Sequence, residues 1–418
     1  MTDPPPGEET YAGPPPTRRP EGTPWYPPAG QPAPWYPPPG HSPPGYPPPQ
    51  AWAPGPYAPA PYGPVPHPPA PFGPAPVAWY PPPSGPPPPG MYGKPPPGTP
   101  PHDVPQPFLL AMRTRSWGWW RPAVGLLLIL VVYLVAAIVT LVIGGVGLFI
   151  ADGASLFELD PADMYGPAFI LVINLVTAVA IPVVWLAWAA THGMRIGWSS
   201  SVLGRLRWRL MPTYVALALL TIGVSIVAAF GLSLATGAMG EEVTGPVASY
   251  GWLLAVVLLT TPLQSAAEEY LFRGYLSQAV AGWLPDPRAG ALLAALVSGV
   301  LFSLAHLPPG LSSFVFYLLV GLAASAVVWL TGGLEAAIAL HSVNNVVIFV
   351  LAGALGEDFL AASESSAGVP WFEVLLALLA LAAFVALVAR SRRRLRPELH
   401  TAAQDLRLPF LADPVPAR

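Results

Sequence analysis

Residues 262–273 read P-L-Q-S-A-A-E-E-Y-L-F-R and place two carboxylates and one arginine inside a long apolar stretch. A charged side chain at the centre of a bilayer costs about 2.5–3.5 kcal/mol on insertion scales, so such a cluster is retained only where it is paired and useful. On a helix, Glu269 and Arg273 share a face, whereas Glu268 is turned by about 100° from Glu269. We therefore predict that Arg273 neutralises Glu269 and leaves Glu268 free for chemistry.

Two further pairs of residues follow in apolar sequence with the same helical spacing. Phe302 precedes His306, and His341 precedes Asn345. Residues at this spacing lie on one face of a helix. Written as patterns, the motifs are E-E-x-x-x-R, F-x-x-x-H and H-x-x-x-N, in that order along the chain. One such motif is weak evidence, but three in order on separate predicted spans form a specific signal.

The three motifs resemble those of the CPBP intramembrane proteases, and all of them match without a departure. That family groups the eukaryotic CAAX prenyl endopeptidases with many bacterial membrane proteins, some of them linked to bacteriocin immunity. The resemblance covers roughly residues 250–355. It implies that Glu268 and His306 act on the attacking water, and that His341 and Asn345 stabilise the oxyanion.

The first 105 residues form a separate region with its own composition. The chain has 61 prolines, and they are concentrated there together with Gly, Tyr, Trp and Ala. Few branched aliphatic side chains are available to bury, so we predict a disordered cytoplasmic tail with polyproline II character. Two interpretations stay open. The segment is either functional, as a docking tail for a proline-recognising partner or a spacer on the cytoplasmic face, or it is a solvated low-complexity tail without a partner.

From residue 122 onward, apolar runs approach or exceed the length of about 20 residues that crosses a bilayer. We predict an all-α polytopic membrane domain over 106–396, with a protease core at about 250–355 and a short C-terminal tail at 397–418. The eight predicted spans are 122–150, 167–190, 212–236, 250–280, 289–307, 312–331, 334–355 and 370–390.

The basic residues predict the orientation of these spans. Arginines lie before the first span, between the second and third, after the fourth and after the eighth, whereas the opposite loops contain Asp and Glu but no Lys or Arg. By the positive-inside rule, both termini of this cell-membrane protein are cytoplasmic. Residues 191–211 are interpreted either as an amphipathic helix on the inner leaflet or as an ordinary basic loop.

The polar residues suit hydrolysis of an amide by one of two routes. In the first, Glu268 deprotonates a water held by His306, while His341 and Asn345 donate hydrogen bonds to the tetrahedral oxyanion. In the second, Glu268, His306 and His341 hold a catalytic Zn²⁺ that keeps a position open for water. The H-E-x-x-H zinc signature is absent from the sequence. We therefore favour the metal-free route and leave the zinc route open.

Two supporting roles and one geometric conflict follow from the same helices. We expect Arg273 to be the structural counter-ion of Glu269, and Phe302 to pack one turn before His306.

The expected distances along the helices do not all agree. At about 1.5 Å of rise per residue, Glu268 and His306 lie at similar distances along their helices, roughly 25–29 Å. His341 comes out at only about 14 Å by the same counting. The sequence does not resolve this difference.

Three functions compete for this pattern. The first is an intramembrane endopeptidase acting on a membrane-associated or lipid-modified peptide. The second is a non-catalytic membrane scaffold or bacteriocin-immunity factor with the same fold. The third is a proton-coupled transporter, because intramembrane Glu and His also form proton relays; such a protein often shows inverted repeats, and the apolar segments show none. No nucleic-acid partner is predicted.

Overall fold

The computed structural model describes residues 101–152, 166–236, 243, 245–356 and 368–403. Within these ranges the chain is almost entirely helical, and its extended contacts are two isolated β-bridges. The all-α prediction is thereby confirmed. Most of the predicted proline-rich tail and the last fifteen residues of the sequence lie outside the described ranges.

Among the described residues, eight helical rods are long and apolar enough to cross a membrane. Their bounds lie close to those of the eight predicted spans, so the prediction of a polytopic helical protein is confirmed. The α-helices are α1 (Trp120–Asp152), α2 (Pro167–Ala178), α3 (Ala180–His192), α4 (Met211–Ala218), α5 (Val224–Thr236), α6 (Tyr250–Glu269), α7 (Ser277–Gly282), α8 (Pro287–Ala305), α9 (Leu311–Thr331), α10 (Glu335–Leu355) and α12 (Trp371–Leu395).

Three of the rods consist of two α-helices joined end to end. α2 and α3 meet at Val179. The π-helical segment Leu219–Gly223 joins α4 to α5, and a second π-helical segment, Tyr270–Leu276, joins α6 to α7. Short π-helical insertions frequently occur at functional sites. The second of them begins directly after Glu269, so the backbone changes its winding beside the charged motif.

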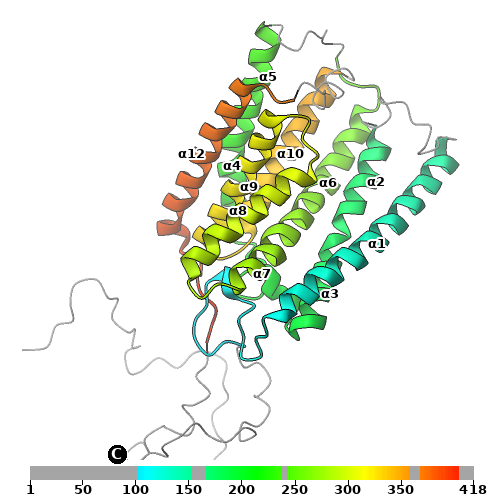
Figure 1. Cartoon of the computed structure of the whole chain (residues 1–418). Helices are drawn as coiled ribbons and strands as arrows, with labels where there is room; N and C mark the ends of the chain where they lie inside the picture. Colours follow the sequence, from blue (N-terminus) through cyan, green and yellow to red (C-terminus); the bar gives the residue numbers. More distant parts are fainter. Residues whose placement is uncertain (1–100, 153–165, 237–242, 244, 357–367, 404–418) are drawn as a thin grey trace, which may run out of the picture. The chain divides into compact units, whose positions relative to one another are not determined.

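α10 occupies a central position in the bundle. It packs against α6, α4 and α9. Figure 1 shows α1 and α2 at one edge of the helices and α12 at the opposite edge. Nearly every residue in the first half of α10 is buried, whereas the apolar side chains of α1 are largely exposed, as befits a helix that faces lipid. The helix that carries His341 is therefore held on several sides by protein.

The turn between α9 and α10 is covered by other parts of the chain. Gly332 adopts the left-handed conformation that ends α9 (φ 71°), and its carbonyl accepts a hydrogen bond from the backbone N–H of Val202 at 3.0 Å. The side chain of Glu335, the first residue of α10, is fully buried. Residues 193–210 therefore lie over the start of α10, which begins below the surface of the protein.

A buried ion pair fastens this covering segment. Nη2 of Arg207 lies 2.7 Å from Oε2 of Glu335, and Nε lies 2.9 Å from Oε1. Burial by itself would lower the pKa of Arg207, but the hydrogen bonds and charge of Glu335 outweigh it and hold that pKa above its ordinary value. Residues 193–210 contain one short helix, the 3₁₀ turn Ile196–Ser199. The amphipathic helix considered for this segment is thus not formed, and the segment is packed more tightly than a simple basic loop.

The residues after α12 also pack against the helical domain. Nη1 of Arg207 donates to the backbone oxygen of Glu398 at 2.8 Å, and the N–H of Thr401 donates to the backbone oxygen of Gln106 at 2.8 Å. His102 is buried as well and contacts the backbone oxygen of Ala111 at 2.8 Å. Both ends of the described chain therefore extend the packed region beyond the predicted limits of 106–396.

Candidate functional site

Glu268, His306 and His341 lie together, although they come from three different helices. Oε2 of Glu268 is 3.9 Å from Nε2 of His306 and 3.7 Å from Nε2 of His341. These separations exceed direct hydrogen-bonding distance, and a water can bridge polar groups across such gaps. Oε2 is buried and has no hydrogen-bond partner within the described part of the chain. The arrangement presents one carboxylate oxygen and two imidazole nitrogens to a shared point.

The other nitrogen of each imidazole is already engaged. Nδ1 of His306 contacts the backbone oxygen of Phe302 at 2.8 Å, and Nδ1 of His341 contacts Oε1 of Glu269 at 2.9 Å. A carbonyl and an ionised carboxylate are acceptors, so each Nδ1 must carry a proton and donate it. In a neutral ring, Nε2 is then a free acceptor that faces Glu268.

Glu269 and Arg273 form a buried pair one turn apart. Nη1 of Arg273 lies 2.9 Å from Oε1 of Glu269, and both side chains are about 1% exposed. Nη2 of Arg273 donates to the backbone oxygen of Gly321 at 3.2 Å, and its guanidinium carbon lies 4.5 Å from the ring centroid of Phe302. The same Glu269 oxygen therefore serves both the arginine and His341, a contact that the sequence did not reveal.

Phe302 packs among the charged residues. Its ring centroid is 4.5 Å from that of His306 and 5.5 Å from that of His341. Together with its stacking on Arg273, these contacts fill the space between the charged pair and both histidines. An apolar ring in this position excludes water from the Glu269–Arg273 pair and limits how far either imidazole can rotate.

Asn345 reaches the cluster through Gln264, a residue that belongs to none of the three motifs. Nδ2 of Asn345 donates to Oε1 of Gln264 at 3.2 Å, and Nε2 of Gln264 donates to Oε1 of Glu268. Gln264 precedes Glu268 by one helical turn, so the i,i+4 spacing was the signal that could have identified it. Asn344 donates to Oδ1 of Asn345 at 3.1 Å.

Tyr317 on α9 is a second residue that sequence reasoning missed. Its ring stacks on His306, with centroids 4.3 Å apart and an interplanar angle of 26°. The stacking fixes one face of the imidazole while Phe302 approaches from another direction. No motif linked these residues, because the contact arises from how α8 packs against α9.

The depth of His341 in the helix bundle, relative to Glu268 and His306, differs from the prediction. The sequence placed it well short of Glu268 and His306, yet its Nε2 is as close to Glu268 as that of His306. One cause is the covered turn at Gly332, which starts α10 inside the protein. Another is the π-helical winding of Tyr270–Leu276, because a wider turn advances less per residue than the α-helix assumed in the counting. The conflict is therefore removed.

The predicted zinc ligands do not form a ready metal centre. Within the described ranges, no group of three or more His, Cys, Asp or Glu side chains is arranged to hold a metal ion. Zinc takes nitrogen and oxygen ligands at about 2.0–2.2 Å, which requires donor atoms closer to one another than the observed separations. Glu268 and the two histidines would have to move inward to hold Zn²⁺, so the zinc route stays a prediction.

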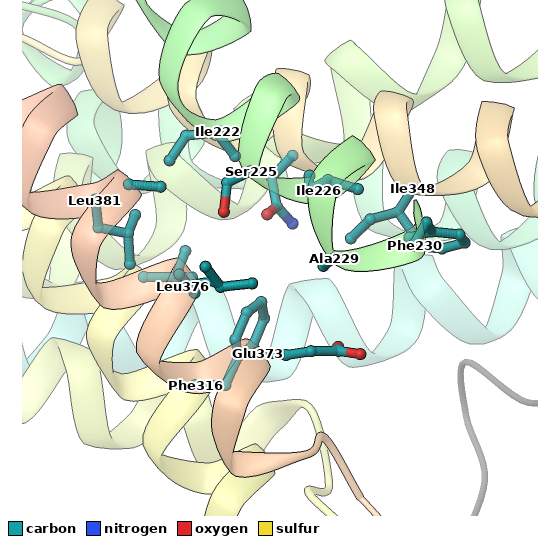
Figure 2. A pocket seen from close by; sticks show the side chains of 14 residues that line it. Ile222, Ser225, Ile226, Ala229, Phe230, Phe316, Ile348, Glu373, Leu376 and Leu381 are labelled. Atoms are coloured by element: carbon teal, nitrogen blue, oxygen red, sulfur yellow. The ribbon is translucent and has the colours of Figure 1, made fainter. Parts of the chain in front are cut away.

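A separate small cavity of about 80 Å³ lies between α5, α9, α10 and α12. Figure 2 shows Ser225 and Glu373 on different walls of this cavity. Asn344 also lines this cavity, whereas Asn345, which accepts its hydrogen bond, does not. Glu373 accepts a hydrogen bond from Ser233 at 3.3 Å. Glu268 and the two clustered histidines do not line this cavity, and we treat it as distinct from the candidate site.

The eight apolar helical rods of the described ranges, together with the buried ionic cluster, define a multi-pass membrane protein with an intramembrane polar site. Residues 250–347, which include all three motifs, match the family model described as Type II CAAX prenyl endopeptidase Rce1-like. The resemblance inferred from the motifs is confirmed for this part of the chain, which is similar to the CAAX-type intramembrane proteases.

One curated relative is the uncharacterized protein YyaK of Bacillus subtilis. It is 28% identical over 200 residues, which are 46% of this chain and 64% of that protein. The chain therefore matches slightly less than two thirds of the length of this relative. No solved structure matches significantly.

Proposed function

We propose that this protein is an intramembrane endopeptidase that hydrolyses a peptide bond in a membrane-associated substrate, including lipid-modified ones. The observation that carries the proposal is the approach of the Glu268 carboxylate to Nε2 of His306 and His341. The family match to residues 250–347 supports proteolysis more than a non-catalytic scaffold or immunity factor. A proline-recognising partner for the N-terminal tail stays a prediction.

In the proposed reaction, Glu268 is the general base. Nε2 of His306 accepts one hydrogen bond from the attacking water, and Glu268 takes the other proton as the water oxygen bonds to the substrate carbonyl carbon. The resulting tetrahedral oxyanion collapses, the C–N bond breaks, and the protonated Glu268 returns its proton to the leaving amine. The two tasks of the carboxylate require an oxygen without a structural partner, and Oε2 meets that requirement among the described residues.

His341 can serve the oxyanion only as an imidazolium. Its Nδ1 proton is directed at Glu269, so donation from Nε2 requires a second proton on the ring. Two carboxylates, Glu268 and Glu269, share the cluster with Arg273, and a charged His341 brings the sum of their charges to zero. Buried ionic groups are best tolerated when balanced in this way. Glu269 would then orient and stabilise the imidazolium, as the carboxylate of a hydrolytic triad does.

We expect Asn345→Ala to lower turnover by roughly 10²–10³, the effect of losing one oxyanion donor. Substrate affinity should change little, because the contact strengthens only as the oxyanion forms. The measurement is kcat and KM for a membrane-bound peptide. Asn344→Ala is the matched comparison, because it removes the hydrogen bond to Oδ1 of Asn345 but no proposed oxyanion donor, and it should lower turnover less than Asn345→Ala. Equal losses in the two variants would contradict the oxyanion role of Asn345.

The activity itself is tested with the purified full-length protein in detergent. Its metal content is measured first, and a library of membrane-associated peptides is then incubated with and without a chelator. Cleavage that resists the chelator supports the metal-free route, whereas loss of cleavage that Zn²⁺ restores supports the zinc route. A folded protein that cleaves none of the peptides would favour the scaffold or immunity function.

We also propose that both termini are cytoplasmic, as the arginine distribution predicts. The chain contains no cysteine, so a single introduced thiol reports its own location. Val243→Cys, at a position 51% exposed between α5 and α6, should react with an impermeant thiol reagent in intact cells. Ser116→Cys, at an exposed position before α1, should react only after permeabilisation. The opposite pattern would reverse the orientation.

A further inference from the structure

A wide apolar groove lies along α6 and α10, on faces that do not carry the polar cluster. Its volume is about 810 Å³, within the range of roughly 300–1,000 Å³ typical of ligand pockets. α3 and α4 contribute the other walls, and the lining is almost wholly apolar. None of the proposed catalytic residues lines this groove, so it is separate from the site described above.

A second hollow, of about 560 Å³, adjoins the apolar groove and is basic. Trp185, Leu206 and Tyr270 line both hollows, which are therefore direct neighbours. The second hollow is also lined by Arg195 and Arg205, and both arginines are exposed. Together the two neighbouring hollows are basic at one end and apolar at the other. We call this pair of hollows the amphiphilic groove.

The arginines at the basic end of the amphiphilic groove do not stabilise the described part of the fold through ion pairs. Arg207 and Arg209, from the same segment, pair with Glu335 and Glu398 at 2.7 and 2.8 Å. Arg195 and Arg205, in contrast, make no ion pair with any carboxylate in the described ranges. Guanidinium groups bind phosphate oxygens through paired hydrogen bonds, so two unpaired arginines at one mouth fit a phosphate-bearing ligand.

Trp185, which lines both hollows, contains a donor without a partner among the described residues. Nε1 of Trp185 is buried and has no hydrogen-bond partner within the described part of the chain. The ring is held edge-on against Tyr270, with centroids 6.1 Å apart, and the hydroxyl of Tyr270 already contacts Ser200 at 2.7 Å. A buried N–H without an acceptor is unfavourable, and a rotation of the Trp185 ring would present this donor to a ligand oxygen in the groove.

We propose that the amphiphilic groove binds one anionic phospholipid from the adjoining membrane leaflet. Its phosphate would lie between Arg195 and Arg205, an ester carbonyl would accept from Trp185, and an acyl chain would run along α6 and α10. This order of charged, intermediate and apolar contacts is the order of chemical groups in a phospholipid, and basic pockets between membrane helices favour anionic headgroups.

The bound lipid would support the two helices that carry the polar cluster. Ala266 and Tyr270 line the groove on either side of the Glu268–Glu269 pair in sequence. Ser342 lines it directly after His341, and its buried hydroxyl has no partner among the described residues. A ligand that binds the folded protein raises its stability by mass action. An anionic lipid should therefore raise the thermal midpoint as well as bind.

The test uses the full chain in detergent with phosphatidylglycerol or phosphatidylcholine, followed by native mass spectrometry and thermal unfolding. The unaltered protein should retain phosphatidylglycerol preferentially and melt at a higher temperature in its presence. Arg195→Ala with Arg205→Ala should weaken that binding by roughly tenfold or more. Trp185→Phe, which removes the N–H and keeps an aromatic ring, should weaken it less.

The matched control is Arg393→Ala with Arg394→Ala, which removes the same charge from exposed positions near the end of α12. This control should bind phosphatidylglycerol as the unaltered protein does. Equal weakening in the two double variants would overturn the proposal, since it would show only general attraction to surface charge. Equal retention of the two lipids by the unaltered protein would also overturn it. Size-exclusion profiles identify variants that misfold. If the Arg195→Ala, Arg205→Ala variant misfolds, the binding of phosphatidylglycerol to Trp185→Phe is the deciding measurement, and unchanged binding by Trp185→Phe would overturn the proposal.

Discussion

Glu268→Gln is expected to reduce turnover by roughly 10²–10⁴ while leaving the protein folded. The substitution removes the proton acceptor but keeps the length and shape of the side chain. The amide oxygen of the new residue can still accept the hydrogen bond from Gln264 that holds the present carboxylate. Turnover of a membrane-bound peptide and the thermal midpoint, both measured on one detergent preparation, check the two parts of this expectation.

Glu373→Gln is the matched control for this substitution. It makes the same chemical change at a carboxylate that lines the separate cavity near α12, so turnover should be retained. If Glu268→Gln proves fully active while Glu269→Gln folds normally and is inactive, the roles of the two adjacent carboxylates are reversed. If both variants cleave at the normal rate, the protease proposal fails.

The span pattern was predictable because bilayer thickness fixes how long an apolar run must be. The bounds of α9 and α10 illustrate this, since apolar composition alone placed both helices within one residue of their described limits. The three motifs also identified the helices whose polar side chains lie together in the structure. Their spacing reports which residues share a face of one helix, and that information is local.

The relative depth of the helices was not predictable in the same way. α10 starts below the surface because Arg207 pairs with Glu335 and because Val202 bonds to Gly332. These partners are more than a hundred residues apart in sequence, and no spacing rule connects them. The stacking of Tyr317 on His306 is hidden for the same reason. Gln264 differs, because its position one turn before Glu268 made its role recoverable from sequence.

The central cluster also shows why one motif residue can have more than one partner. The E-E-x-x-x-R pattern predicts the Glu269–Arg273 pair, which the structure contains at 2.9 Å. It does not predict that the same carboxylate oxygen also contacts His341 from α10. Charge in a low-dielectric setting is costly unless compensated, so a buried carboxylate with two cationic or polar neighbours is favoured over one with a single neighbour.

Glu269→Gln is therefore expected to destabilise the protein, in contrast to Glu268→Gln. The substitution leaves Arg273 as an uncompensated charge at a fully buried position. Breaking a buried ion pair by removing one partner costs about 3–5 kcal/mol of folding free energy. The amide oxygen can still accept from Nδ1 of His341, so the loss should be mainly electrostatic. The yield of folded protein and its thermal midpoint should both fall, and activity should fall with them.

The double variant Glu269→Gln with Arg273→Met separates this electrostatic effect from a catalytic one. Removing both charges leaves no stranded ion, and Met keeps an apolar side chain beside Phe302, where the guanidinium now stacks. Replacing both members of a buried pair is often close to neutral for stability, so the thermal midpoint should recover most of its loss. Turnover should remain low, because His341 would have lost the carboxylate that favours its imidazolium.

A double variant that stays as unstable as Glu269→Gln would show that Glu269 stabilises the fold through contacts other than Arg273. Recovery of both stability and full turnover would show that Glu269 is only a counter-ion of Arg273, and the proposed stabilisation of the His341 imidazolium by that carboxylate would be wrong.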